Sequence, residues 1–198
     1  MTILLLTRHG ETIDNAKHII QGHRPGELNE VGIKQMTELR DRLAREHIDV
    51  FVSSDLKRAI DSCRIIAEPH GKEVVTMPLL RERDCGQFTG RYIPDIGKDE
   101  PWPEDMENIA QLTERASRFL DYMRQKYPNK TVLAVGHGII NKAIQSVYFD
   151  KPIHEVPKMN NGELRELRLQ QEGKGYAIST ENVTNTISLK SNFDEFVR

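Results

Sequence analysis

The sequence has few cysteines and no long apolar run. Only two of its 198 residues are cysteine, Cys63 and Cys85, which is too few for a disulfide framework and is typical of a protein from a reducing compartment. The apolar stretch at the front, residues 3–6, is too short for a signal peptide or a membrane span. We therefore expect a cytoplasmic protein that does not enter a membrane.

The chain also lacks a marked excess of charge of either sign. Its net charge of −2 argues against a general affinity for nucleic acid, which needs a basic face. Hydrophobic residues at 37% and charged residues at 29% are ordinary for a globular protein and exclude a disordered one. No histidine or cysteine pair has the spacing of metal ligands, so we expect neither a metal nor another cofactor.

The length of the chain suits one domain, residues 1–198, and leaves open whether the protein is a monomer or a homodimer. Strand and helix patterns alternate along it, which predicts an α/β fold: a three-layer sandwich with a mostly parallel central sheet flanked by helices. Asn29 and Asp55 are expected to be N-caps of the first two helices. The patterns predict strands at 3–7, 48–53, 73–77, 131–135, 163–169 and 176–183, and helices at 30–46, 56–67, 105–126 and 139–149.

Two of the predicted strands end in the same kind of sequence. Arg8-His9-Gly10 follows the first strand and Gly136-His137-Gly138 follows the last buried one. If both strands are central and parallel, these residues meet at one edge of the sheet, where α/β proteins bind their ligands. A third strand leads to Arg58 in the first turn of a helix, where an anion is favoured.

The residue types at this edge suit a phosphoryl group. The arginines are planar, permanently charged donors, a histidine nitrogen can attack or carry a proton, and Gly138 offers a backbone N–H. Taken singly, His137 could equally be a histidine of the core with its hydrogen bonds satisfied, and Arg58 could equally be a solvated arginine on the helix surface. Their joint placement at strand ends favours an anion site.

The motifs together resemble those of the histidine phosphatase superfamily, in the branch that contains the cofactor-dependent phosphoglycerate mutases. The resemblance runs from about residue 3 to residue 169, and five motifs occur in the expected order. They are Arg8-His9-Gly10-Glu11-Thr12 with Asn15, then Gln21-Gly22 with Leu28-Asn29-Glu30-Val31-Gly32, Ser53-Ser54-Asp55-Leu56-Lys57-Arg58-Ala59, Leu80-Arg81-Glu82-Arg83-Asp84-Cys85-Gly86 with Gly90, and Gly136-His137-Gly138.

The resemblance implies a role for each of these motifs. His9 would be the nucleophile and form a phosphohistidine that water hydrolyses, without a metal. Glu82 would protonate the leaving oxygen and then take a proton from the attacking water, which requires a protonated carboxyl at the start. The phosphoryl oxygens would be bound by Arg8, Asn15, Gln21, Gly22, Arg58, His137 and Gly138.

Three side chains near these motifs leave alternatives open. Glu82 could instead form a salt bridge with Arg81 or Arg83. His23, in the loop after Gly22, could touch a substrate. Trp102, the only tryptophan, could line the pocket or hold the lid in place.

A lid is expected over residues 86–105, where glycines and prolines mark an irregular loop. Residues 91–105 contain two basic and five acidic side chains, a net charge of −3, which should repel a doubly phosphorylated substrate. We therefore expect a phosphatase acting on small phosphate monoesters rather than a mutase. Phosphoryl transfer of the phosphoglycerate mutase type and a non-catalytic binding module on the same fold remain the alternatives.

Two further features set limits on the prediction. Gly138 follows His137, whereas members of the acid phosphatase and phytase branch have a His-Asp pattern there. That branch is therefore disfavoured. Nothing in the lid separates sugar phosphates from other small esters, and residues 184–198 carry no usable pattern.

Overall fold

A five-stranded sheet forms the centre of the computed structural model, which describes residues 1–97 and 99–170. The strands lie in the order β3-β2-β4-β1-β5, and only β5, at one edge, is antiparallel to its neighbour. Their bounds are β1 Thr2–Arg8, β2 Val50–Ser53, β3 Val74–Thr76, β4 Thr131–Gly136 and β5 Leu164–Leu169. The predicted mostly parallel α/β sheet is thus confirmed, while the predicted strand at 176–183 lies outside the described residues.

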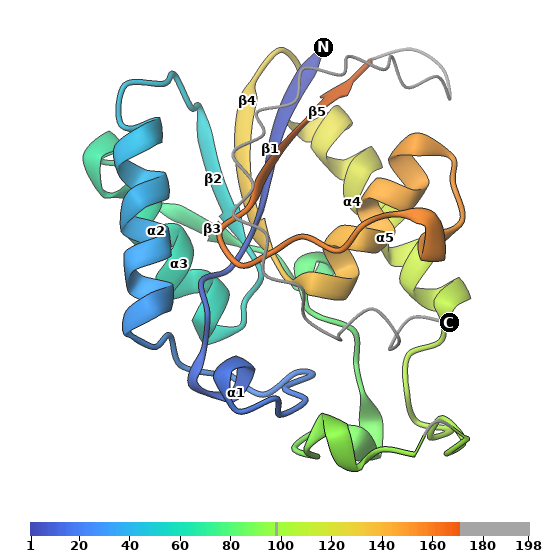
Figure 1. Ribbon diagram of the computed structural model, residues 1–198. Helices are drawn as coiled ribbons and strands as arrows, with labels where there is room; N and C mark the ends of the chain where they lie inside the picture. The colour runs from blue at the N-terminus through green and yellow to red at the C-terminus, as the bar shows by residue number, and fades with distance from the viewer. Residues whose placement is uncertain (98, 171–198) are drawn as a thin grey trace.

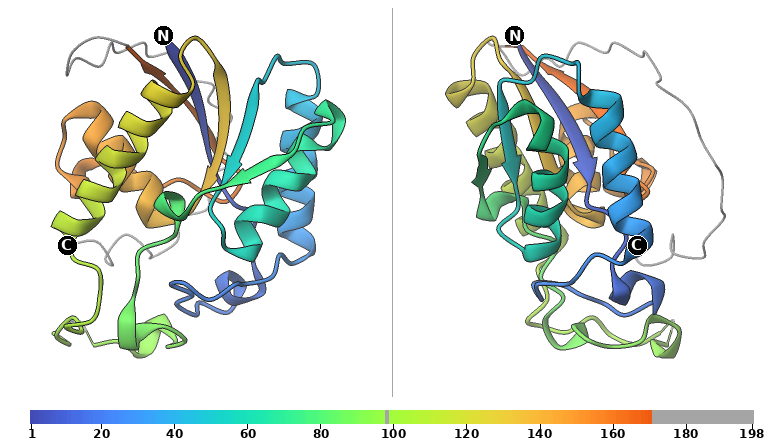
Figure 2. Two further views of the ribbon diagram at one scale, coloured as in Figure 1. Left: turned by 180° about the vertical axis from the view of Figure 1, so that it is seen from behind. Right: turned by 90° about the vertical axis from the view of Figure 1, so that its left-hand side faces the viewer.

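Helices cover both faces of this sheet (Figure 1). Helices α2 (Glu30–Leu43) and α3 (Lys57–Ala67) pack on one face, and α4 (Ile109–Lys126) and α5 (Gly138–Phe149) pack on the other, an arrangement that Figure 2 shows from two further sides. The short α1 (Ile13–Ala16) lies beyond the ends of the strands, beside the lid. The predicted three-layer sandwich is therefore present.

Each face of the sheet has its own apolar core, because strand residues alternate between the two faces. Leu4 and Leu6 of β1 pack with Phe119 and Leu120 of α4 and with α5 residues. On the opposite face, Phe51 of β2 packs with residues of α2 and α3. Burial of both faces explains why β1, β2 and β4 are continuous apolar runs.

Local capping rules gave one correct and one incorrect helix start. The side chain of Asn29 accepts the N–H of Gly32 at 2.8 Å, as expected of the α2 N-cap. Asp55 is not the cap of α3, which begins after Leu56 without a side-chain cap. Its carboxylate instead accepts two bonds from Arg81, at 2.7 and 2.6 Å, so a long-range ion pair replaces the local cap.

The region predicted as a lid contains only 3-10 turns among its described residues, at Gly86–Phe88 and Ile93–Asp95. It pairs with the loop after α1 through an isolated bridge between Ile19 and Tyr92. The helix expected from 105 starts instead at Ile109, where Asn108 and Gln111 form a capping box. In the described part of the chain, no helix combines the length and apolar character needed to cross a membrane.

Candidate active site

The ends of β1 and β4 bring the two histidine motifs together. The strands are parallel and neighbouring, with Arg8 in register with Gly136, so His9 and His137 follow at the same level. The two rings lie 5.0 Å apart between centroids, with their planes inclined at 62°. The sequence prediction that both motifs share one edge of the sheet is thus supported by the strand register.

His9 is held in the tautomer that a nucleophile needs. Its Nδ1 lies 2.7 Å from the carbonyl oxygen of Gly10, which can only accept, so Nδ1 carries the proton. Nε2 therefore carries the unprotonated lone pair of the ring, which accepts a hydrogen bond from Arg58 Nε at 3.3 Å. Burial, and then the positive charges of Arg58 and Arg8, lower the pKa of His9 well below its ordinary value of 6.5. The ring is therefore neutral at neutral pH.

His137 is the second buried histidine of the site and lies against His9. Its side chain is inaccessible to solvent, and neither ring nitrogen has a hydrogen-bond partner among the described residues. Burial and the charge of Arg58 lower the pKa of His137 well below 6.5. A buried ring with unpaired nitrogens has the capacity to bind a polar group that enters the site.

Arg58 is almost completely buried at 1% exposure and joins the site to the loop after α1. Besides His9, its guanidinium donates to the carbonyl oxygens of Gly22 at 2.9 Å, Pro25 at 3.3 Å and Arg24. Burial lowers the pKa of Arg58 to about 10, so the group stays charged at neutral pH. Its charge therefore lies beside Nε2 of His9.

Arg8 supplies the second guanidinium, beside the first turn of α5. Its Nη1 donates to the carbonyl of Met159 at 3.0 Å, whereas its Nε has no partner among the described residues. A Cβ on Gly138 would lie 2.8 Å from Lys158 Cε and 3.6 Å from Arg8 Cζ. The glycine thus lets both cations lie against the start of the helix, and Lys158 also lines the pocket.

Glu82 reaches the site from the loop after β3 and caps α5. Its Oε1 accepts the N–H groups of Ile139 at 3.0 Å, Ile140 at 3.1 Å and Arg83 at 2.9 Å. Oε2 accepts only the Ile139 N–H, at 3.3 Å. The alternative salt bridge to Arg81 or Arg83 is wrong: Arg81 pairs with Asp55, and Arg83 Nε donates to the Glu107 carbonyl.

The remaining predicted binding residues differ in how they contribute. Asn15 lines the pocket, and its Oδ1 accepts from the N–H of Thr12 at 3.3 Å and from Asn161 at 3.4 Å. Gln21 lines the pocket with a buried Oε1 that has no partner among the described residues. Gly22 also lines it, but its carbonyl is used to hold Arg58.

The glycine of the first motif has a packing role. A Cβ on Gly10 would lie 2.5 Å from the carbonyl oxygen of Gly32, and one on Gly32 would lie 2.0 Å from the carbonyl oxygen of Glu11. The backbone after β1 therefore lies directly against the first turn of α2. This close approach explains why two distant motifs both contain glycine.

Most of the predicted site residues line one pocket at the carboxyl ends of the strands. His137 and Gly138 are not in its lining, although the His137 ring lies 5.0 Å from that of His9. The lining of the pocket combines the charged groups with an apolar wall, so it suits a small ester with a carbon skeleton. The wall is made by Ile19, Ile20, Cys85, Ile93, Met106 and Ile139, and the pocket is otherwise lined by Arg8, His9, Asn15, Gln21, Gly22, Arg58, Glu82, Arg83 and Lys158.

Sequence reasoning missed Lys158 and Asn161. Asn161 donates to the carbonyl oxygen of His9 at 2.9 Å, and both residues belong to the segment between α5 and β5. An Asn-Asn-Gly turn before the β5 pattern is the only local signal there, and it indicates a turn rather than a site.

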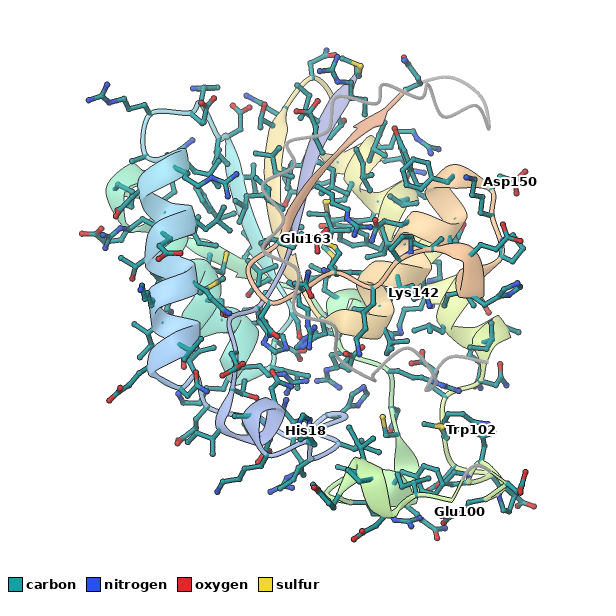
Figure 3. All side chains as sticks on the ribbon, in the orientation of Figure 1. His18, Glu100, Trp102, Lys142, Asp150 and Glu163 are labelled. Carbon is teal, nitrogen blue, oxygen red and sulfur yellow. The ribbon has the colours of Figure 1, made fainter. Side chains whose placement is uncertain are left out.

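The lid and His23 contact the site differently from what the sequence suggested. Among the described residues, none of the five acidic lid residues lines the pocket that contains His9, but Glu104 and Asp105 line a second pocket that shares Met106 with it. Trp102, which is labelled in Figure 3, lies at the lower end of the molecule near Glu100. Its ring packs on Phe88, and Arg83 Cζ lies 5.1 Å from its centre, so Trp102 joins the lid to the loop that carries Glu82. A ring nitrogen of His23 lies 2.8 Å from the Glu82 carbonyl oxygen, and His23 lines the second pocket rather than the one that contains His9.

Comparisons with known proteins agree with this geometry. The family described as the histidine phosphatase superfamily (branch 1) matches residues 4–184. The chain is 36% identical over 160 residues to a metal-independent phosphoserine phosphatase of Arabidopsis thaliana, covering 73% of this chain and 67% of the relative. It is 34% identical to phosphoglycerate mutase-like protein 4 of the same plant, covering 73% and 69%.

A solved structure is similar in fold and shares 28% of the sequence. It is phosphoserine phosphatase from Entamoeba histolytica in complex with 3-phosphoglyceric acid, with a TM-score of 0.74 over 85% of this chain and 91% of that one.

Proposed function

The chain belongs to the histidine phosphatase superfamily and is a phosphoric monoester hydrolase, and we propose that it acts through a phosphohistidine formed on Nε2 of His9. The observation that carries the proposal is the bond from His9 Nδ1 to the Gly10 carbonyl, 2.7 Å long. It leaves the Nε2 lone pair beside the Arg58 guanidinium, 3.3 Å away. A neutral nitrogen next to a fixed positive charge is suited to attack a phosphoryl group.

In the first step Nε2 of His9 attacks phosphorus, and the bond from phosphorus to the ester oxygen breaks. Arg8, Arg58 and His137 bind the phosphoryl oxygens and stabilise the charge that spreads over them. Asn15 adds a neutral donor through its amide, because its Oδ1 already accepts two bonds. The product of this step is a phosphohistidine and an alkoxide leaving group that needs a proton.

Glu82 supplies that proton. Because Oε1 already accepts three backbone N–H groups, Oε2 is the oxygen that carries and donates the proton to the leaving oxygen. In the second step the same carboxylate takes a proton from water, whose oxygen attacks phosphorus and releases His9 and phosphate. Both steps then balance without a metal or another cofactor.

The substrates we propose are small phosphate monoesters that carry a carboxylate. Relatives are named for phosphoserine and for phosphoglycerate, which share that group. The apolar wall and the cations Arg83 and Lys158 support a compact ester with a second anionic group. Phosphoserine and 3-phosphoglycerate are therefore the first substrates to test, with isomerisation of 3-phosphoglycerate measured as the sign of a mutase.

The decisive experiment traps the intermediate. Rapid acid-free quenching with 32P-labelled substrate should label the wild-type protein in an alkali-stable, acid-labile form, and His9→Ala should take up no label and hydrolyse no ester. A folded His9→Ala protein that retains hydrolysis would contradict the mechanism. His18→Ala is the matched control, because His18 is exposed and outside the pocket lining.

A further inference from the structure

The loop that carries Glu82 has little regular structure of its own. It lies between the 3-10 turns at Pro78–Leu80 and Gly86–Phe88, and we define residues 79–84, which include the end of the first turn, as the acid loop. A loop of this kind can place a carboxylate precisely only if other elements hold its backbone. Much of that support comes from Glu107, which precedes the N-cap of α4, and from Arg115 within that helix.

Arg115 binds three successive parts of the acid loop. Its Nη1 donates to the carbonyl oxygens of Leu79 at 2.9 Å and Arg81 at 2.7 Å, and its Nη2 donates to that of Glu82 at 3.4 Å. A guanidinium is the only side chain with enough donors in a fixed plane to make all these contacts. The carbonyl of Glu82 itself is thereby held, together with the bond from His23 at 2.8 Å.

Glu107 orients Arg115 and binds the far end of the same loop. Its carboxylate accepts Arg115 Nε at 2.8 Å and Nη2 at 2.6 Å, the two-point contact that fixes a guanidinium plane. The same carboxylate accepts the N–H of Asp84 at 3.3 Å, and the backbone N–H of Glu107 donates to the Asp84 carbonyl at 3.0 Å. The Glu107 carbonyl accepts Arg83 Nε at 2.7 Å.

The contacts of Arg115 and Glu107 are better explained by a role in placing Glu82 than by a contribution to the stability of the fold alone. The two side chains are 16% and 14% exposed, and a pair this buried gains little net stability because desolvation offsets its attraction. Its bonds instead converge on the backbone on both sides of Glu82. A shift of the acid loop would move the Glu82 carboxyl away from the start of α5 and from the leaving oxygen.

We propose that Arg115 and Glu107 are positioning residues for the general acid, and that they act by fixing the backbone on both sides of Glu82. The inference rests on the proposed role of Glu82. Neither residue lines the pocket that contains His9 and Arg58; both line a second pocket that shares Met106 with it. Their loss should therefore reduce proton delivery to the leaving group while leaving phosphate binding intact.

The test compares two substrates that differ in their need for a proton. p-Nitrophenyl phosphate has a good leaving group, whereas phosphoserine has a poor one and depends on the acid. Arg115→Lys and Glu107→Gln should lower kcat for phosphoserine about 10- to 100-fold, the effect of a misplaced catalytic group. The kcat for p-nitrophenyl phosphate should change less than threefold, and KM for both should stay within about twofold.

A double-variant cycle separates this role from a general loss of structure. On a Glu82→Gln background, Arg115→Lys should cause no further loss with phosphoserine, because the acid is already absent. Arg118→Lys, an exposed arginine on the same helix, is the matched control and should resemble wild type. Melting temperatures are measured for every variant, and the assays run well below the lowest of them.

The outcomes distinguish the inference from the proposed function beneath it. If Glu82→Gln slows both substrates equally, the proposed acid is wrong. If Glu82→Gln shows the selective loss but Arg115→Lys and Glu107→Gln slow both substrates equally, or if the double variant is additive, the positioning role is overturned. Should Arg115→Lys not fold, Glu107→Gln gives the same comparison.

Discussion

The rings of His9 and His137 lie 5.0 Å apart, edge to face, at the ends of neighbouring parallel strands. Both are buried, and burial together with the arginine charges lowers the pKa of each well below 6.5. In the unfolded chain both rings return to their ordinary value. Folding therefore competes with their protonation in acid.

The sign of this effect predicts how stability depends on pH. Because the folded pKa values are lowered, the unfolded chain binds more protons below pH 6.5, and stability is lost as the pH falls from 6.5 toward the folded values. Each histidine can cost up to about 1.4 kcal/mol between pH 7.5 and pH 5.5, the limit for a folded ring that stays neutral over that range. Urea unfolding of wild type and of His9→Gln/His137→Gln at both pH values measures the difference, which should be smaller in the variant. An equal loss in both proteins would contradict the assignment.

Arg58→Lys should reduce activity and loosen the loop after α1. The lysine keeps the charge but cannot donate at once to His9, Gly22 and Arg24, as the guanidinium does. We expect kcat for p-nitrophenyl phosphate to fall about 100-fold, as for loss of one donor to a transition-state anion. Limited proteolysis should cleave within residues 21–26 faster than in wild type. Arg64→Lys, exposed on the same helix, is the control, and an unchanged kcat for Arg58→Lys would contradict its role.

Gly10→Ala should destabilise the protein through the backbone rather than through the chemistry. The new Cβ would lie 2.5 Å from the carbonyl oxygen of Gly32, which α2 holds in place. We expect a loss of unfolding free energy of roughly 2–3 kcal/mol, as for overpacking. Gly97→Ala, whose Cβ would meet its nearest neighbour at 3.8 Å, is the control and should change little in urea unfolding.

Lys158→Met should weaken substrate binding more than turnover. Lys158 lines the pocket beside Arg8 and adds positive charge near His9 without taking part in the proposed proton transfers. Loss of a charge-assisted contact of about 1.5 kcal/mol predicts a roughly tenfold higher KM for phosphoserine, with kcat nearly unchanged. Lys151→Met, an exposed lysine after α5, serves as the comparison. A fall in kcat at constant KM would show that Lys158 acts in the transition state instead.

The parts of the site that follow strands were predictable from sequence. An apolar run followed by Arg8-His9-Gly10 or Gly136-His137-Gly138 indicates both the strand and the place where it ends. Parallel pairing then brings the ends together without further information. Arg58 follows the same logic, because β2 is the other neighbour of β4.

The parts held by long-range contacts were not predictable. Asn161 reaches His9 across 152 positions because antiparallel β5 returns along β1, and no local pattern encodes that pairing. Asp55 satisfies the rule for an N-cap, yet Arg81 offers its carboxylate two charge-assisted bonds, which outweigh one bond to a backbone N–H. The placement of the lid residues was not predictable either: Ile93 lies in the wall of the pocket with His9, whereas the acidic Glu104 and Asp105 line a second pocket that shares Met106 with it.

The unpaired nitrogens of the site should make the enzyme slow down as its product accumulates. Arg8 Nε and both ring nitrogens of His137 have no partner among the described residues, and inorganic phosphate, with oxygens on every side, is well suited to engage them. The reaction releases this anion into the same pocket. Product inhibition should therefore bend progress curves before the ester is consumed, and the phosphate level around the protein would set its working rate.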